Sequence, residues 1–129
     1  MKQIFLVLTF ILVAKINAQV SFSCNYTQVC YWNSTSKEYT NCSGSESNCL
    51  FAFNKEFTMF THTTEEMKST YYITSSEYDQ SKEIWFYYTT SDVGNKYLFI
   101  VDPKNKQIRT LPLKEGADYI IAYTIKASF

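Results

Sequence analysis

Apolar and polar side chains alternate along the stretch from Phe22 to Trp32, whose sequence is FSCNYTQVCYW. Its even positions are mostly aromatic or cysteine, and its odd positions are mostly polar. Successive side chains of an extended chain point to opposite faces, so the pattern predicts a strand with one apolar face. Two of the four cysteines, Cys24 and Cys30, fall on that face.

The remaining chain divides into short β-type segments separated by clusters of turn-forming residues. The expected strands cover residues 37–42, 49–53, 57–63, 70–78, 83–90, 96–101, 107–113 and 118–127. Residues 43–48, with the sequence SGSESN, are expected to form an exposed loop. Residues 63–66 match the S/T-x-x-E capping box, so one helical turn is expected there. Turns recur at roughly the 8–12-residue spacing of a sandwich or barrel.

Composition supports this assignment. The chain holds 11 tyrosines, 10 phenylalanines and two tryptophans, with only three glycines and two prolines. Aromatic and β-branched residues favour strands. The predicted fold class is therefore all-β: an antiparallel up-and-down meander, forming a small barrel or sandwich with at most one short helix.

The first 18 residues have the layout of a secretory signal peptide. Lys2 precedes an apolar run from residue 4 to residue 14, and the small Ala18 precedes Gln19. Lys15 ends the run well before the ~20 apolar residues that a membrane span requires. The expected organisation is a signal peptide, residues 1–18, and a single all-β domain, residues 19–129, that is secreted or periplasmic. The "NAQ" ending resembles the signals of small exported proteins of Gram-negative bacteria.

Charge excludes several classes of partner. The 12 basic and 12 acidic residues balance, and without Lys2 and Lys15 the mature chain has 10 against 12. This balance gives no general attraction to nucleic acid or to an anionic membrane. Arg109 is the only arginine, which further disfavours phosphate recognition.

The four cysteines have the spacing C-x5-C-x11-C-x6-C, which in an exported chain favours disulfides over a metal site. Three pairings are formally possible. In an extended strand Cys24 and Cys30 lie about 20 Å apart, too far for a bond between them. A hairpin that folds back near residue 35 predicts the nested pairs Cys30–Cys42 and Cys24–Cys49. The usual C-x2-4-C zinc knuckle is missing from the sequence, so we expect no metal.

His62 is the only histidine and the one candidate for acid–base chemistry. As a general base it would be oriented by Glu65 or Glu66. The sequence offers no obvious nucleophile beside it, so we interpret it as an imidazole at a strand end or in a loop, hydrogen-bonded to neighbouring threonines. We expect no catalytic residue and no cofactor.

The strand at residues 83–90, EIWFYYTT, is aromatic on both faces. Such a strand is either buried on both sides or presents aromatic rings to a partner. Trp85, Tyr87 and Tyr72 are therefore the candidate binding surface, for a glycan, a peptide or protein, or a small apolar ligand. Asn25, Asn33 and Asn41 begin glycosylation sequons that would be used only in a eukaryotic source.

Three functional hypotheses follow. The first is a non-catalytic module that binds through an aromatic sheet face. The second is a lipocalin-like barrel that carries an apolar ligand. The third is an inhibitor of an extracellular hydrolase, in which a disulfide-braced loop of this protein, such as SGSESN, would enter the active site of the hydrolase.

Overall fold

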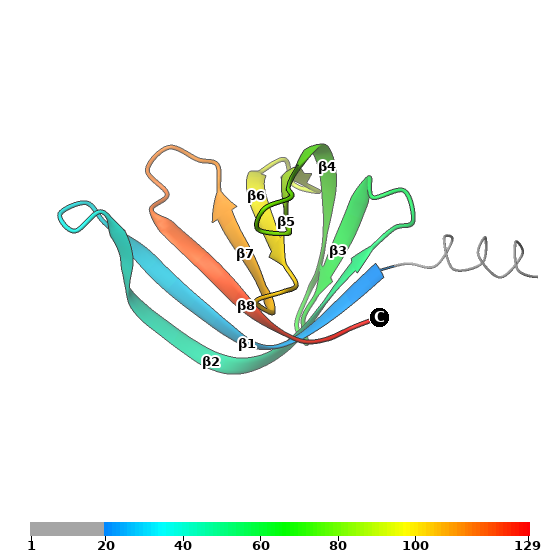
Figure 1. Ribbon diagram of the computed structural model, residues 1–129, viewed down its shortest axis with the longest axis horizontal. Helices are drawn as coiled ribbons and strands as arrows, with labels where there is room; N and C mark the ends of the chain where they lie inside the picture. The colour runs from blue at the N-terminus through cyan, green and yellow to red at the C-terminus, as the bar shows by residue number, and fades with distance from the viewer. Residues whose placement is uncertain (1–19) are drawn as a thin grey trace, which may run out of the picture.

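The structure, a computed structural model, describes residues 20–129 as eight strands in chain order (Figure 1). The strands are β1 (Val20–Asn33), β2 (Glu38–Phe53), β3 (Met59–Thr63), β4 (Lys68–Asp79), β5 (Ile84–Ser91), β6 (Lys96–Asp102), β7 (Gln107–Pro112) and β8 (Tyr119–Ser128). The predicted signal peptide, residues 1–18, lies outside the described residues.

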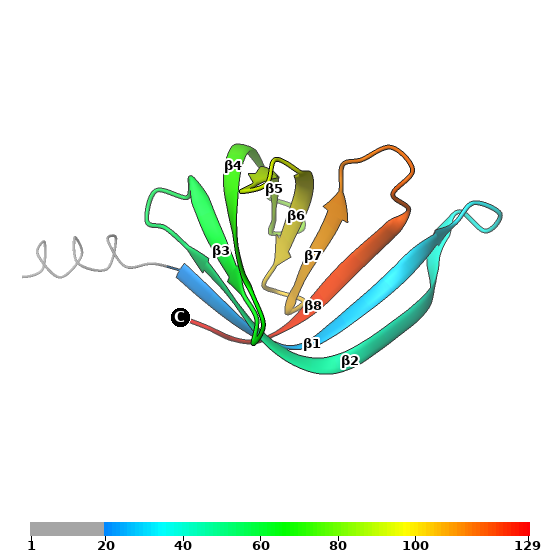
Figure 2. The same ribbon diagram turned by 180° about the vertical axis from the view of Figure 1, so that it is seen from behind.

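Each strand pairs antiparallel with the next one along the chain, and β8 pairs back with β1 to close a barrel. Seen from behind, β8 runs beside β1 (Figure 2). The all-β meander is confirmed, and of the two expected architectures the structure is the barrel. Residues 20–129 contain no helix. The expected helical turn is instead the tight β3–β4 turn, where the Met67 amide donates to the Thr64 hydroxyl at 3.1 Å.

The prediction that SGSESN forms a loop is wrong. Residues 43–48 belong to β2, a continuous strand of 16 residues. Residues 43–46 pair with β1, from Val29 opposite Ser43 to Tyr26 opposite Glu46, and residues 47 and 48 lie at the register shift before the Cys24–Cys49 pair. The segment has the composition of a loop because its residues are exposed. No apolar core lies against them, so apolar side chains are not needed there.

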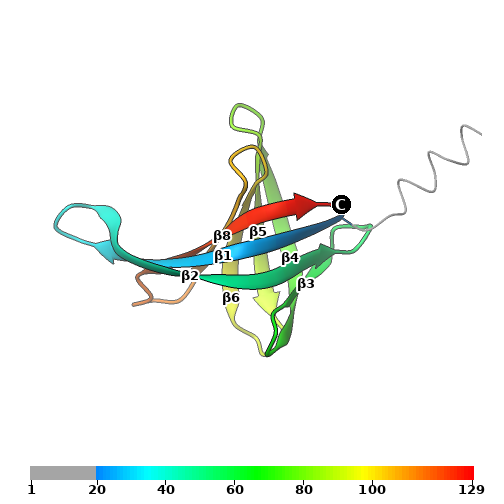
Figure 3. The ribbon, with the colours of Figure 1, turned by 90° about the horizontal axis from the view of Figure 1, so that it is seen from below.

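The β1–β2 hairpin projects beyond the rest of the barrel (Figures 1 and 3). β3 pairs with β2 only from Leu50 to Phe53, so residues 38–49 of β2 extend past it. We call β1 from Asn25 onward, together with β2 up to Asn48, the arm. β8 accompanies β1 along the arm as far as Tyr119, which lies opposite Tyr31.

The alternation along β1 changes face at Asn25. Cys24 lies opposite the buried Ile125, whereas Tyr26 lies opposite the exposed Thr124. The pairing with β2 also shifts register at this point. Cys24 therefore points into the barrel, and Cys30 points to the other side of the sheet. The single apolar face expected for Phe22–Trp32 is divided in two by this irregularity.

Aromatic rings fill the barrel interior. The side chains of Phe51 and Phe60 are 0% exposed, and those of Phe53 and Phe99 are 2% exposed. Phe51 lies at the centre of the cluster, with ring centroids 6.2 Å from Phe60, 6.2 Å from Phe99 and 5.1 Å from Tyr123. These residues come from four different strands, so one cluster ties the wall together.

We expect Phe51→Ala to lower the free energy of unfolding by about 3–5 kcal/mol, because the cavity left by a buried ring is only partly filled by relaxation. Urea denaturation monitored by tryptophan fluorescence measures the change. Val93→Ala, at a side chain 78% exposed, is the matched control and should change stability by less than about 0.5 kcal/mol. Equal effects of the two substitutions would contradict the central position of Phe51.

Candidate functional site

The most chemically distinctive group in the barrel wall is a pair of thiols. Cys24 on β1 and Cys49 on β2 are register partners, and both are buried free cysteines. Directly opposed residues of antiparallel strands have Cα atoms about 4.5–5.5 Å apart, within the range of a disulfide. Strand pairing thus places the two sulfur atoms side by side.

The predicted cysteine pairs are both recognisable, but only one of them is bonded. Cys30 and Cys42 form the expected disulfide across β1 and β2, in the arm. Cys24 and Cys49 lie opposite each other as predicted, and in this structure both are thiols. The Cys24–Cys49 bond therefore stays a prediction.

His62 lies beside the thiol pair, on the inner side of β3. It pairs in register with Phe51, and the two rings stack with centroids 4.3 Å apart and an interplanar angle of 2°. Tyr123 packs edge-on against it at 5.1 Å. The Nε2 atom of His62 is buried and has no hydrogen-bond partner. The expected hydrogen bonding to neighbouring threonines is therefore wrong for this nitrogen, because the ring turns into the aromatic core.

The two thiols differ in acidity. A hydrogen bond from the Cys24 thiol, helped by the neighbouring His62 imidazole, lowers the pKa of Cys49 from 9.0 to about 5, despite burial, which acts in the opposite direction. The same hydrogen bond, together with burial, raises the pKa of Cys24. Burial also raises the pKa of Tyr123, so its hydroxyl stays neutral. Cys49 is thus the thiol that ionises first.

Access to this group is one-sided. A pocket of about 820 Å³ opens between the arm and the β3–β4 turn, and Cys49, His62 and Tyr123 are among its lining residues. The other lining residues are polar or acidic apart from one methionine: Asn25, Thr27, Glu46, Ser47, Asn48, Thr64, Glu65, Glu66 and Met67. Cys24 is 2% exposed and does not line the pocket.

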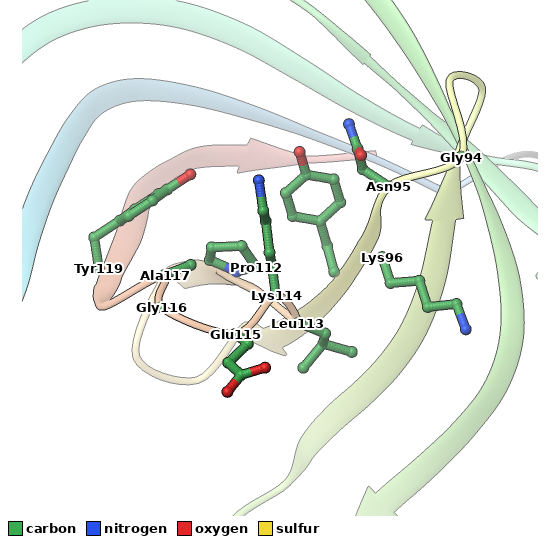
Figure 4. A pocket seen from close by; sticks show the side chains of 11 residues that line it. Gly94, Asn95, Lys96, Pro112, Leu113, Lys114, Glu115, Gly116, Ala117 and Tyr119 are labelled. Atoms are coloured by element: carbon green, nitrogen blue, oxygen red, sulfur yellow. The ribbon is translucent and has the colours of Figure 1, made fainter.

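A second pocket, of about 640 Å³, lies at the same end of the barrel, between the β5–β6 turn and the β7–β8 loop. Figure 4 shows Asn95, Lys114 and Tyr119 pointing to one side of it, while Leu113 and Glu115 point to the other. This lining is mostly loop residues, and it brings together no nucleophile and base.

The three residues of the expected binding surface do not share a face. Tyr87 belongs to the core, where its ring lies 5.4 Å from Phe53, and burial raises its pKa to about 12. Trp85 lies on the same side of β5 and is 40% exposed, because it stands near the end of the barrel. Tyr72 pairs with Met59 and Thr90 and is 50% exposed on the outer surface.

The partner of Trp85 is Tyr78, a residue that sequence reasoning missed. The two residues are opposite each other on β5 and β4, with ring centroids 4.5 Å apart. Tyr78 is 45% exposed. Behind them, the ring of Tyr87 lies nearly parallel to Trp85 at 6.0 Å and 11°. The exposed Tyr78–Trp85 pair therefore packs on the buried ring of Tyr87. This cluster lies at the end of β4 opposite to the pocket that Cys49 lines.

If Cys24 and His62 together favour the Cys49 thiolate, each substitution should shift the pH dependence of Cys49 alkylation. In reduced protein, iodoacetamide labelling of Cys49, quantified by peptide mass spectrometry, should rise with a midpoint near pH 5. Cys24→Ala should move the midpoint up by the larger amount, because its hydrogen bond is the largest cause. His62→Phe keeps the aromatic stack and should move it up by less. Profiles that superimpose for all three proteins would contradict this assignment.

Neither family models, nor curated proteins, nor solved structures gave a match to this chain. Among residues 20–129 no helix is long and apolar enough to cross a membrane. Asn25, Asn33 and Asn41, which begin the three sequons, all have exposed side chains. The site is therefore interpreted from its own residues.

Proposed function

We propose that this protein is an exported β-barrel that binds carbohydrate through the Tyr78–Trp85 ring pair and performs no catalysis at that surface. The observation that carries the proposal is a pair of half-exposed rings supported from below by the buried Tyr87. Two half-exposed rings in contact form a small apolar patch on the surface, the kind of feature that marks an interaction site. The Cys30–Cys42 disulfide supports export, because such bonds persist in oxidising compartments.

The surroundings of the rings favour a sugar. A pyranose ring has a face of C–H groups that packs on an aromatic ring, and a rim of hydroxyl groups that needs hydrogen-bond partners. Tyr and Trp each combine an apolar face with a polar atom. Ser76 lies on the same side of β4 as Tyr78, two residues before it. Its exposed hydroxyl can form hydrogen bonds with the hydroxyl groups of the sugar.

Support from the core limits the entropy that binding must overcome. Trp85 contacts Tyr78 across the hairpin and Tyr87 along its own strand. A side chain held by two neighbours loses less rotamer freedom when a ligand arrives. The β4–β5 hairpin is therefore a preorganised surface.

We expect a glycan array probed with the purified protein to identify at least one bound carbohydrate. Trp85→Ala should weaken that binding by about tenfold or more, since stacking on an aromatic face is lost, and Tyr78→Ala should weaken it by a smaller factor. Tyr72→Ala removes an equally exposed ring from the outer surface and is the control that should bind normally. Binding that survives Trp85→Ala, or an array without any bound glycan, would refute the proposal.

A lipocalin-like carrier is the second candidate, and the closed eight-stranded barrel is the observation that favours it. The pocket of about 820 Å³ has the size of small-molecule sites, but its lining is mostly polar, and aromatic rings occupy the interior behind it. We rank the carrier below the carbohydrate module for that reason. The inhibitor hypothesis named SGSESN as its example of an inserting loop, and this segment is strand.

The carrier makes a separate prediction. Titration with a fluorescent fatty acid should give saturable binding that Tyr123→Ala weakens, because Tyr123 lines the pocket. Trp85→Ala should leave it unchanged, since that ring stands at the other end of β4. No saturable binding, and no lipid in the native mass spectrum, would count against the carrier.

A further inference from the structure

We propose that Cys49 and Cys24 form a thiol–disulfide exchange site, in which Cys49 attacks a small disulfide in the pocket and Cys24 resolves the product. The site is separate from the Tyr78–Trp85 surface, at the other end of β4. Thus it does not depend on carbohydrate binding. The reactants are small disulfides that are cationic or neutral.

The geometry separates the two roles. An attacking thiol must be reached from solvent, and Cys49 lines the pocket. A resolving thiol needs only to reach the attacking sulfur, and Cys24 lies directly across the strand pair, behind Cys49 and 2% exposed. The bond that would form joins the same two strands that the Cys30–Cys42 disulfide already joins. A cross-strand disulfide is therefore compatible with this hairpin.

Acid–base properties agree with these roles. The thiolate is the nucleophile in exchange, and the pKa of Cys49 is the lower of the two. His62 lines the same pocket and helps to lower the pKa of Cys49.

The reaction balances in two steps. The Cys49 thiolate attacks R–S–S–R, so a bond forms between Cys49 Sγ and one sulfur while the S–S bond of the reagent breaks and releases R–S⁻. Cys24 then loses its proton and attacks Cys49 Sγ, which forms Cys24–Cys49 and releases the second R–S⁻. The two thiol protons end on the two released thiolates. The protein dithiol is oxidised, and the disulfide reagent is reduced to two thiols.

The pocket selects the reagent by charge. Glu46, Glu65 and Glu66 line it, and within the described part of the chain its lining includes no lysine or arginine. A wall of one sign of charge raises the local concentration of the opposite sign. A cationic disulfide such as cystamine should therefore react faster than oxidised glutathione, which is anionic.

The test uses purified protein, reduced with dithiothreitol while folded, desalted, and followed by intact-mass spectrometry. With cystamine, Cys24→Ser should accumulate one mixed disulfide on Cys49, whereas Cys49→Ser should gain none at Cys24. The unsubstituted protein should pass through the adduct and end with a Cys24–Cys49 bond, located by peptide mapping. Circular dichroism confirms that both variants are folded.

Two further measurements complete the test. Cystamine should react about tenfold or more faster than oxidised glutathione at low ionic strength, and the ratio should shrink with added salt or with Glu65→Gln/Glu66→Gln. Three results would each overturn the proposal: an equal adduct on Cys24 in Cys49→Ser, faster reaction with oxidised glutathione, or a Cys24–Cys49 bond that resists reduction in the folded protein. The last result would make the pair a structural cross-link.

Discussion

The structure depends on β1 pairing along both of its edges. β2 covers one edge and β8 the other, so the first and last strands meet and the sheet has an inside. An eight-stranded barrel is just wide enough for side chains to fill it. Closure therefore forces inward residues from distant parts of the chain into one cluster, and this is why Phe51 contacts rings from other strands. Without the β1–β8 pairing, the same side chains would form an exposed apolar face.

The arm is the part of the wall where β2 has β1 as its only neighbouring strand. β2 continues beyond β3, so the inner side of the arm faces a pocket instead of a packed core. Burial stabilises this region little, and the Cys30–Cys42 bond lies here. A cross-link stabilises by restricting the unfolded chain, which makes it most useful where few apolar contacts are available. The pocket and the disulfide are thus two consequences of one long hairpin.

Local pattern was sufficient to predict much of the fold. Alternation and turn residues predicted the all-β meander and the Cys30–Cys42 bond. Whether the meander forms a barrel or a sandwich depends on long-range pairing between the two ends of the chain. Pattern within a segment does not contain that information. The irregularity at Asn25 was missed for the same reason, since register is a property of two strands.

The candidate functional sites were harder to predict because each consists of residues from different strands that meet only in the folded sheet. Nothing within its own strand distinguishes Tyr78, because its importance comes from lying opposite Trp85 on the next strand. His62 was interpreted as a residue without a nucleophile nearby, and Cys49 is 13 positions away in the sequence, on the adjacent strand. One local signal existed. Phe60 and His62 are two residues apart, so a strand that buries Phe60 also turns His62 inward.

The inward position of His62 has a cost that packing alone does not explain. A buried nitrogen without a partner costs about 1–3 kcal/mol relative to a satisfied one, and an apolar ring would stack on Phe51 equally well. Cys49, on the neighbouring strand, is the group that this imidazole influences, because His62 helps to lower the pKa of the Cys49 thiol. The polar atoms of the ring, which an apolar residue would lack, therefore change the chemistry of the barrel wall and not its packing.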